Sequence, residues 1–146
     1  MVDVSLKKTT LREAWATGVV LMRAETLKKI EDNTIKKGDV LGVAKISGIM
    51  AAKKTPEIIP LCHPLHLTGI DLTFSLVQEP PSVTITAKVQ AMDRTGVEME
   101  AMTAVAAAAL TIYDMCKAVD RGIQITGLGL LKKTGGKSGV FLRPSV

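Results

Sequence analysis

Two ionisable residues in the last third of the chain have the spacing to act together. Asp114 and Lys117 are three residues apart, so on a helix their side chains lie on the same face. A carboxylate and an ammonium group held side by side can divide the acceptance and donation of a proton when their surroundings shift their pKa values. The spacing alone favours a simpler interpretation, a surface ion pair in which Lys117 also interacts with the C-terminal end of the helix dipole. At this point both interpretations stay open.

A second group of candidates is formed by Cys62, His63 and His66. A proline on each side of the Cys-His pair fixes φ, so the backbone around His63 should be held rigidly. Imidazole titrates near neutral pH and suits a general acid or base, although a single histidine is more often structural. Together with Cys116 these residues are the whole supply of soft metal ligands, and no CxxC or HExxH spacing occurs. We therefore expect no metal site and no bound cofactor.

Basic residues outnumber acidic ones and several flank glycine turns. Nineteen Lys and Arg against 14 Asp and Glu give a net charge of +5 and a pI near 9.3, which favours an anionic partner such as a phosphate-bearing metabolite or nucleic acid. The stretch Gly135-Gly136-Lys137-Ser138 suggests a P-loop, but Leu131 stands where the Walker pattern needs glycine. A glycine loop that holds Lys137 against a phosphate and a plain flexible turn remain equal alternatives.

The residues of the first candidate pair lie at the end of a long predicted helix, Thr95–Lys117. Thr95 and Glu98 form a capping box at its start, and Ala104–Leu110 is almost all alanine, the best helix former. The middle of the helix is apolar on all sides, so we expect it to be buried. Glu98 and Glu100 should point to nearly opposite sides, which means that they cannot serve one pocket of the same chain.

The remaining pattern predicts one α+β domain over residues 1–146. Alternating apolar residues indicate strands at Gly69–Val77 and Ser82–Met92, joined by a hairpin at Glu79-Pro80-Pro81. Further strands are expected at Trp15–Met22, Gly122–Leu131 and Gly139–Leu142, and helices at Ala24–Glu31 and Val40–Lys54. The order strand-helix-helix-strand-strand-helix-strand is a split βαβ pattern. It predicts an antiparallel sheet with helices packed on one face.

Composition limits the compartment and the class of protein. Hydrophobic residues make up 47% of the 146 positions, as in a globular domain. The longest apolar run, Ala104–Leu110, is far shorter than the ~20 residues of a membrane span, and MVDVSLKKTT contains no apolar core of a signal peptide. Two cysteines are too few for a secreted disulfide scaffold. We therefore expect a cytoplasmic protein with reduced thiols and no membrane partner.

Three stretches together resemble one known family. They are Ala51–Leu65 (AAKKTPEIIPLCHPL), Thr95–Thr103 (TGVEMEAMT) and Leu110–Ala118 (LTIYDMCKA), with GGKSG near the end. They resemble the molybdenum-cofactor biosynthesis protein C family, whose members are cyclic pyranopterin monophosphate synthases. The resemblance extends from Met1 to Phe141 and departs at Val140, where many members have a polar or acidic residue.

The resemblance implies a fold, a reaction and an assembly. The fold would be ferredoxin-like. The reaction would convert a cyclised GTP derivative, 3′,8-cyclo-7,8-dihydro-GTP, to cyclic pyranopterin monophosphate with release of pyrophosphate, a lyase activity of molybdenum cofactor biosynthesis. The assembly would be a homohexamer built as three dimers, with the active sites at dimer interfaces.

The resemblance also assigns residues. Asp114 and Lys117 match the catalytic pair of the family, and Lys37 matches a catalytic lysine donated across the interface. The substrate-contacting positions are Leu61, Cys62, His63, Met99 and Glu100. Further pocket positions are Glu98, Lys53 and Lys133.

A second hypothesis from a different class is a basic, non-catalytic nucleic-acid-binding module on a similar sheet. Aromatic residues are only 3% of the chain, which is few for a protein that stacks bases. We therefore expect a small-molecule substrate and no nucleic acid. Salt-dependent binding of a duplex would distinguish the module from the enzyme.

Overall fold

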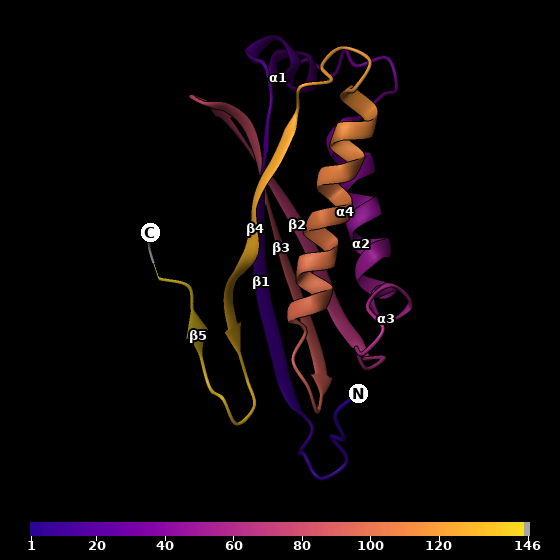
Figure 1. The fold of residues 1–146 in the computed structure, drawn as a ribbon, viewed down its shortest axis with the longest axis vertical. Coiled ribbons are helices and arrows are strands. Elements are labelled where there is room, and N and C mark those ends of the chain that lie inside the picture. Colours follow the sequence, from indigo (N-terminus) through magenta and orange to yellow (C-terminus); the bar gives the residue numbers. More distant parts are fainter. Residues whose placement is uncertain (145–146) are drawn as a thin grey trace.

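The computed structural model describes residues 1–144 as a twisted five-stranded sheet with α2 and α4 side by side against one face (Figure 1). The elements are β1 (Thr10–Leu21), α1 (Ala24–Glu31), α2 (Val40–Lys53), α3 (Thr55–Ile58), β2 (Leu67–Gln78), β3 (Pro81–Asp93), α4 (Glu98–Cys116), β4 (Gln124–Thr134) and β5 (Phe141–Leu142). The strand order is β2-β3-β1-β4-β5, and every neighbouring pair is antiparallel. This arrangement confirms the predicted ferredoxin-like α+β fold.

The covered face of the sheet carries small residues, which let the helices approach closely. Ala14 and Ala16 of β1 are completely buried, as are Ala104 and Ala108 of α4. Where α2 crosses α4, a Cβ on Gly48 would lie only 2.9 Å from the carbonyl oxygen of Ala104, so glycine is required at this contact. Close packing of this kind fixes α4 against the sheet, and its two ends are thereby held in defined places.

The start of α4 differs from the prediction. The helix begins at Glu98, its N-cap position is Val97, and no side chain caps it. The predicted capping box of Thr95 and Glu98 is therefore wrong. The carboxylate of Glu98 instead accepts a hydrogen bond from Lys133 Nζ at 2.6 Å, a contact across the fold that the local sequence does not encode.

The middle of α4 is also not buried on all sides as expected. Ala108 and Ala109 are fully buried, whereas Leu110 is 61% exposed. Among the helices of residues 1–144, α4 is the one that is long and apolar enough to cross a membrane, but half of its apolar stretch is buried inside the fold, as in a core helix of a globular protein. The exposed side is an apolar surface that a single chain leaves uncovered.

The central strand of the sheet, β1, and its neighbour β4 are longer than predicted. β1 begins at Thr10 rather than Trp15, and β4 continues to Thr134 rather than ending at Leu131. Since side chains alternate along a strand, the extension of β4 sends Lys132 to the open face, beside Trp15, and Lys133 to the helical face. The hairpin of β2 and β3 and the helices Ala24–Glu31 and Val40–Lys53 agree with the prediction to within two residues.

Candidate active site

At the C-terminal end of α4, a carboxylate lies between two lysines. Lys117 Nζ lies 2.7 Å from Oδ1 of Asp114, and Lys37 Nζ donates to Oδ2 at 2.7 Å. The hydrogen bond from Lys117 contributes most to lowering the pKa of Asp114, and the bond from Lys37 contributes next. Together they lower it to about 2. The bond to Asp114 in turn raises the pKa of Lys117. We call Lys37, Asp114 and Lys117 the lysine–aspartate cluster; all three side chains are about half exposed and can meet a ligand.

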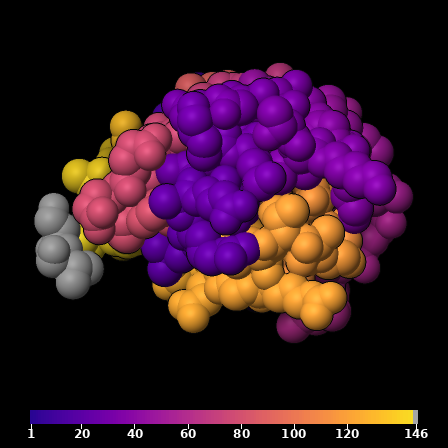
Figure 2. All heavy atoms as spheres, turned by 90° about the horizontal axis from the view of Figure 1, so that it is seen from above, coloured from indigo at the N-terminus to yellow at the C-terminus, as the bar shows by residue number. Residues whose placement is uncertain are grey.

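Lys37 reaches Asp114 from the connection between α1 and α2. Gly38, at φ +104°, makes the turn after Lys37, in a conformation that favours glycine. The next residue, Asp39, caps α2 by accepting a hydrogen bond from the N–H of Gly42 at 2.9 Å. Figure 2, seen onto this end of the molecule, shows the purple α1–α2 region against the orange end of α4. The chain's own fold therefore sets the position of Lys37.

This contact differs from what the family resemblance implied for Lys37. The resemblance implied donation across an interface, whereas Lys37 and Asp114 interact within one chain, through both the carboxylate and the main-chain oxygen of Asp114, the latter at 3.0 Å. The connection after α1 folds back along the end of α4, and no second chain is needed to bring the two residues together.

The predicted substrate-contacting residues gather at the opposite end of α4. They line a cleft of about 510 Å³, here called the Cys–His cleft, whose walls are Val2, Val4, Lys7, Leu61, Cys62, His63, Leu65, Thr95, Gly96, Glu98, Met99 and Glu100. The expectation that Glu98 and Glu100 cannot serve one pocket is wrong. The cleft lies at the first turn of α4, where side chains from different sides of the helix can reach the same space.

Glu100 and Cys62 are electrostatically unusual members of this cleft. Glu100 is 3% exposed, and burial, with a further contribution from the charge of Glu98, raises the pKa of Glu100 from 4.5 to about 7. Burial raises the pKa of the Cys62 thiol, and the nearby charge of Glu100 raises it further. His63 Nε2 donates to the carbonyl oxygen of Val2 at 2.8 Å. The cleft thus contains a carboxyl group that can hold or release a proton near neutral pH.

A larger, basic cleft of about 760 Å³ adjoins the Cys–His cleft, sharing Lys7, Thr95, Gly96 and Glu98 with it. Its walls are Leu6, Lys7, Lys8, Thr10, Arg12, Thr95, Gly96, Glu98, Lys133, Gly136, Lys137 and Ser138. Five of these side chains are cationic and one is a carboxylate. The glycine loop therefore does bring Lys137 to a concave, positively charged surface, as the phosphate interpretation required.

Sequence reasoning missed Lys7, Lys8 and Arg12 as members of this cleft. The available signal was the alternation along β1, in which Arg12 falls on the same face as the buried Ala14 and thus points toward the start of α4. Gly136 helps to place it, because a Cβ there would lie 1.9 Å from a terminal nitrogen of Arg12. The glycine allows the guanidinium to lie directly against the loop.

Two predicted positions lie outside both the clefts and the lysine–aspartate cluster. Lys53, at the end of α2, lines a separate hollow of about 320 Å³ with Leu67 and Ile70. His66, an alternative general acid or base, is 97% exposed and lies 3.8 Å from Asp93. Within residues 1–144, no three His, Cys, Asp or Glu side chains are grouped as metal ligands would be.

The two groups of candidate residues are far apart within one chain. Glu98 and Asp114 are separated by 16 positions of the same helix, which at 1.5 Å per residue is ~24 Å. Figure 1 shows the two ends of α4 at opposite ends of the helical layer. One chain therefore does not unite the lysine–aspartate cluster with the two clefts.

Comparison with known proteins identifies the family. The model of the MoaC family matches residues 1–136. The chain belongs to the MoaC family. The cyclic pyranopterin monophosphate synthase of Heliobacterium modesticaldum is 57% identical over 143 residues, which cover 98% of this chain and 90% of that protein. The one of Pelotomaculum thermopropionicum is 59% identical over 143 residues, covering 98% and 84%. Both ends of α4, the lysine–aspartate cluster and the Cys–His cleft lie inside the part matched by the MoaC family, and of the basic cleft only Lys137 and Ser138 lie beyond it.

Proposed function

We propose that this chain is a cyclic pyranopterin monophosphate synthase, the activity for which its MoaC-family relatives are named. It acts in the cytoplasm as a lyase on 3′,8-cyclo-7,8-dihydro-GTP and releases pyrophosphate. The observation that carries the proposal is the lysine–aspartate cluster. An ordinary surface pair of Asp114 and Lys117 needs no second lysine, yet the fold brings Lys37 from a distant loop to 2.7 Å from the same carboxylate.

The basic cleft suits the triphosphate of this substrate. Lysine and arginine side chains neutralise phosphate oxygens, and cations fixed around a leaving pyrophosphate stabilise the charge that develops on it. Arg12 and Lys137 approach from different parts of the chain, and Lys133 is held at 2.6 Å from Glu98. A triphosphate can replace Glu98 as the partner of Lys133, because both are anionic.

The lysine–aspartate cluster suits the proton transfers of the reaction. Opening the purine ring requires protons to be removed at one atom and delivered at another. Asp114, ionised at neutral pH, can accept a proton, and the ammonium groups of Lys37 and Lys117 can donate one. Glu100, with its pKa near 7, supplies a second group that exchanges protons at the working pH.

The ~24 Å between the two groups supports a site shared by two chains. If two copies pack with their α4 helices antiparallel, the lysine–aspartate cluster of one copy lies near the clefts of the other. Exposed apolar residues at the outside of the helical layer offer a surface for this contact: Val43, Ile46, Met50 and Leu110 are between 46% and 63% exposed. We propose that three such dimers form the hexamer.

The nucleic-acid-binding module is less well supported. Trp15 is the large aromatic side chain of the open sheet face, but Lys88 Nζ lies 5.0 Å and Lys132 Nζ 4.8 Å from its ring centroid. These cations occupy the ring surface on which a base would stack. The basic side chains of the cleft line a concave site of nucleotide size rather than a long track.

The direct test is to incubate the assembled protein with the cyclised GTP derivative and to measure pyrophosphate and cyclic pyranopterin monophosphate together. GTP itself serves as the control substrate and should give neither product. Stoichiometric formation of both products supports the proposal. A folded hexamer that binds the substrate but releases no pyrophosphate would overturn it, and salt-sensitive duplex binding by the same preparation would favour the nucleic-acid-binding module.

A further inference from the structure

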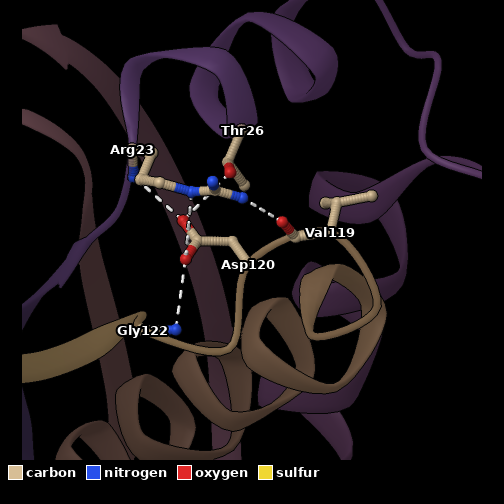
Figure 3. Close-up of polar contacts among 5 residues, drawn as sticks. All are labelled: Arg23, Thr26, Val119, Asp120 and Gly122. Carbon is tan, nitrogen blue, oxygen red and sulfur yellow. Dashed lines mark hydrogen bonds and ion pairs between the residues drawn. The ribbon is translucent and has the colours of Figure 1, made fainter.

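A buried carboxylate lies just behind the lysine–aspartate cluster. Asp120, three residues after Lys117, is 4% exposed and accepts hydrogen bonds on both oxygens (Figure 3). Oδ2 accepts from the N–H of Arg23 and from the hydroxyl of Thr26, both at 2.9 Å. Oδ1 accepts from the N–H of Gly122 at 3.1 Å and lies 3.5 Å from Arg23 Nε. No function proposed above uses this residue.

These contacts keep Asp120 charged despite its burial. Burial acts to raise its pKa, but the hydrogen bonds from Arg23, Thr26 and Gly122 outweigh that effect and lower the pKa below 3.8. The carboxylate also lies at the start of α1, where Arg23 occupies the N-cap position and makes no side-chain cap. A negative charge is favoured at a helix N-terminus. Asp120 therefore places a negative charge at the start of α1 and binds it through the N–H of the N-cap residue Arg23 and the hydroxyl of Thr26.

Asp120 joins the two chain segments that carry the lysine–aspartate cluster. Its own N–H donates to Cys116 at 3.0 Å, which ties it to the last turn of α4. On the other side it binds Arg23, the N-cap residue of α1, and Thr26 in the first turn of that helix. The chain then runs from α1 directly into the connection that carries Lys37. Arg23 adds a second link by donating to the carbonyl oxygen of Val119.

We propose that Asp120 is a positioning residue: it fixes α1 to the end of α4 and thereby holds the ammonium group of Lys37 against Asp114. Asp120 lines a hollow of about 450 Å³ with Lys117, but it is 4% exposed and both of its oxygens already accept hydrogen bonds within the chain. Its effect on the reaction passes through Lys37. The inference rests on the proposed function for its kinetic part only, since the placement of Lys37 can be measured without any reaction.

The kinetic test compares Asp120→Asn with a matched control. The asparagine keeps the volume and one acceptor oxygen, but it removes the charge and presents an N–H₂ group to hydrogen-bond donors. We expect kcat to fall by about tenfold or more with KM little changed, since a misplacement of about 1 Å can cost on the order of a hundredfold. Asp32→Asn makes the same chemical change in an exposed carboxylate at the other end of α1 and should leave kcat unchanged.

Thr26 provides a milder variant in case Asp120→Asn folds poorly. Thr26→Val removes the hydroxyl bond to Asp120 and keeps the shape, so kcat should fall several-fold; Thr26→Ser keeps the hydroxyl and should restore kcat. A double mutant then separates positioning from general destabilisation. Adding Asp120→Asn to Lys37→Met should lower the melting temperature further but not kcat, because the residue through which Asp120 acts is already gone.

Two results would overturn the proposal. One is a normal kcat in folded Asp120→Asn and Thr26→Val. The other is a kcat of the double mutant that is lower than that of Lys37→Met by the same factor by which Asp120→Asn lowers the kcat of the wild type. Hydrogen exchange tests the positioning role of Asp120 without any turnover, so a failure of this role can be told apart from a failure of the proposed enzymatic function. The amides of residues 34–38 should exchange faster in Asp120→Asn than in Asp32→Asn; equal exchange would overturn the positioning role even if the wild type proved to be inactive on the cyclised GTP derivative.

Discussion

The two ends of α4 show how opposite surroundings change one functional group. Asp114, at the C-terminal end, is about half exposed, and two lysines lower its pKa to about 2. Glu100, at the N-terminal end, is 3% exposed, and burial raises its pKa to about 7. A neighbouring cation favours the charged carboxylate, whereas desolvation disfavours it. One helix thus carries one permanently ionised carboxylate and one that titrates near neutral pH.

The difference between the pKa values of Asp114 and Glu100 is the opposite of what the helix dipole would produce. The positive N-terminal end should stabilise the charge of Glu100 and the negative C-terminal end should destabilise that of Asp114. Both pKa values move the other way, so burial outweighs the dipole at Glu100 and the two lysines outweigh it at Asp114. The contrast teaches that the local contacts at each end, rather than position along the helix, decide which carboxylate stays ionised and which titrates near neutral pH.

The largest effect is expected when the chains are kept apart, because the two ends of α4 can form one site only across two chains. We predict that the protein sediments as a hexamer of about six times 15.5 kDa. Leu110→Glu places a charge in the exposed apolar surface between the two ends and should dissociate the assembly and abolish turnover. Leu142→Glu, an equally exposed leucine on β5 away from the helical layer, is the control and should stay assembled. A stable, fully active monomer at micromolar concentration would contradict both the assembly and the shared site.

The next largest effect is expected at the ionised end. Asp114→Asn keeps the shape and removes the charge, so we expect turnover to fall by at least about a hundredfold, the low end for losing a general acid or base. Melting temperature and substrate binding should change little, because asparagine keeps hydrogen bonds. Lys117→Ala should behave similarly, with weaker binding because a cation is lost. Steady-state release of pyrophosphate is the measurement.

The matched control for this variant is Asp71→Asn. Asp71 pairs with Lys45 at 2.9 Å and is 62% exposed, close to the 54% of Asp114, but it lies outside the clefts and the cluster. Exposed ion pairs of this kind contribute little to stability, and turnover of Asp71→Asn should equal that of the wild type. Near-normal turnover in Asp114→Asn as well would restore the simple ion-pair interpretation of Asp114 and Lys117.

Mixing inactive variants tests which end each chain contributes. Asp114→Ala and Lys133→Ala damage opposite ends of α4, so a mixed dimer keeps one intact site of two, and exchange should restore roughly a quarter of the activity. Lys37→Ala mixed with Asp114→Ala should restore nothing, because both residues belong to one chain's cluster. Subunit exchange is verified with differently tagged chains. Recovery by the second mixture would place Lys37 in the neighbour's site, as the family resemblance implied.

How much of this the sequence could predict depends on how local each signal is. The strands β2 and β3 were predicted because Ile70, Leu72 and Phe74 alternate with polar residues along one segment. The start of α4 was not predicted correctly, because Glu98 accepts a hydrogen bond from Lys133, 35 positions away, and does not cap its own N-terminal turn. Capping rules describe neighbours in sequence, and this contact depends on how β4 packs beside α4.

The same distinction holds for the candidate site. Asp114 and Lys117 lie three residues apart on one helix, so their pairing could be predicted from spacing, and the Cys62–His63 pair was marked by its flanking prolines. The basic cleft could not be predicted, because Arg12 and Lys137 meet only through the pairing of β1 with β4. Nor could the network at Asp120, whose partners lie near the start of the chain.

The smallest expected effect is on stability at the buried end. Because the pKa of Glu100 is raised from 4.5 to about 7 on folding, the folded chain binds more protons than the unfolded chain between these values. Stability from Glu100 is then fully present below pH 4.5 and is lost as the pH rises to about 7. At about 1.4 kcal/mol for each pKa unit, the total is on the order of 3 to 4 kcal/mol per chain.

Glu100→Gln should remove this dependence, because glutamine does not titrate. Urea unfolding at pH 5, 6, 7 and 8, at one fixed chain concentration, should show the variant gaining stability relative to the wild type as the pH rises. Glu98→Gln is the companion variant: removing the neighbouring charge should move the titration of Glu100 to lower pH, since that charge contributes to the raised pKa. A constant difference between wild type and Glu100→Gln across this range would mean that Glu100 is ionised throughout, and both carboxylates of α4 would then carry the same charge at working pH.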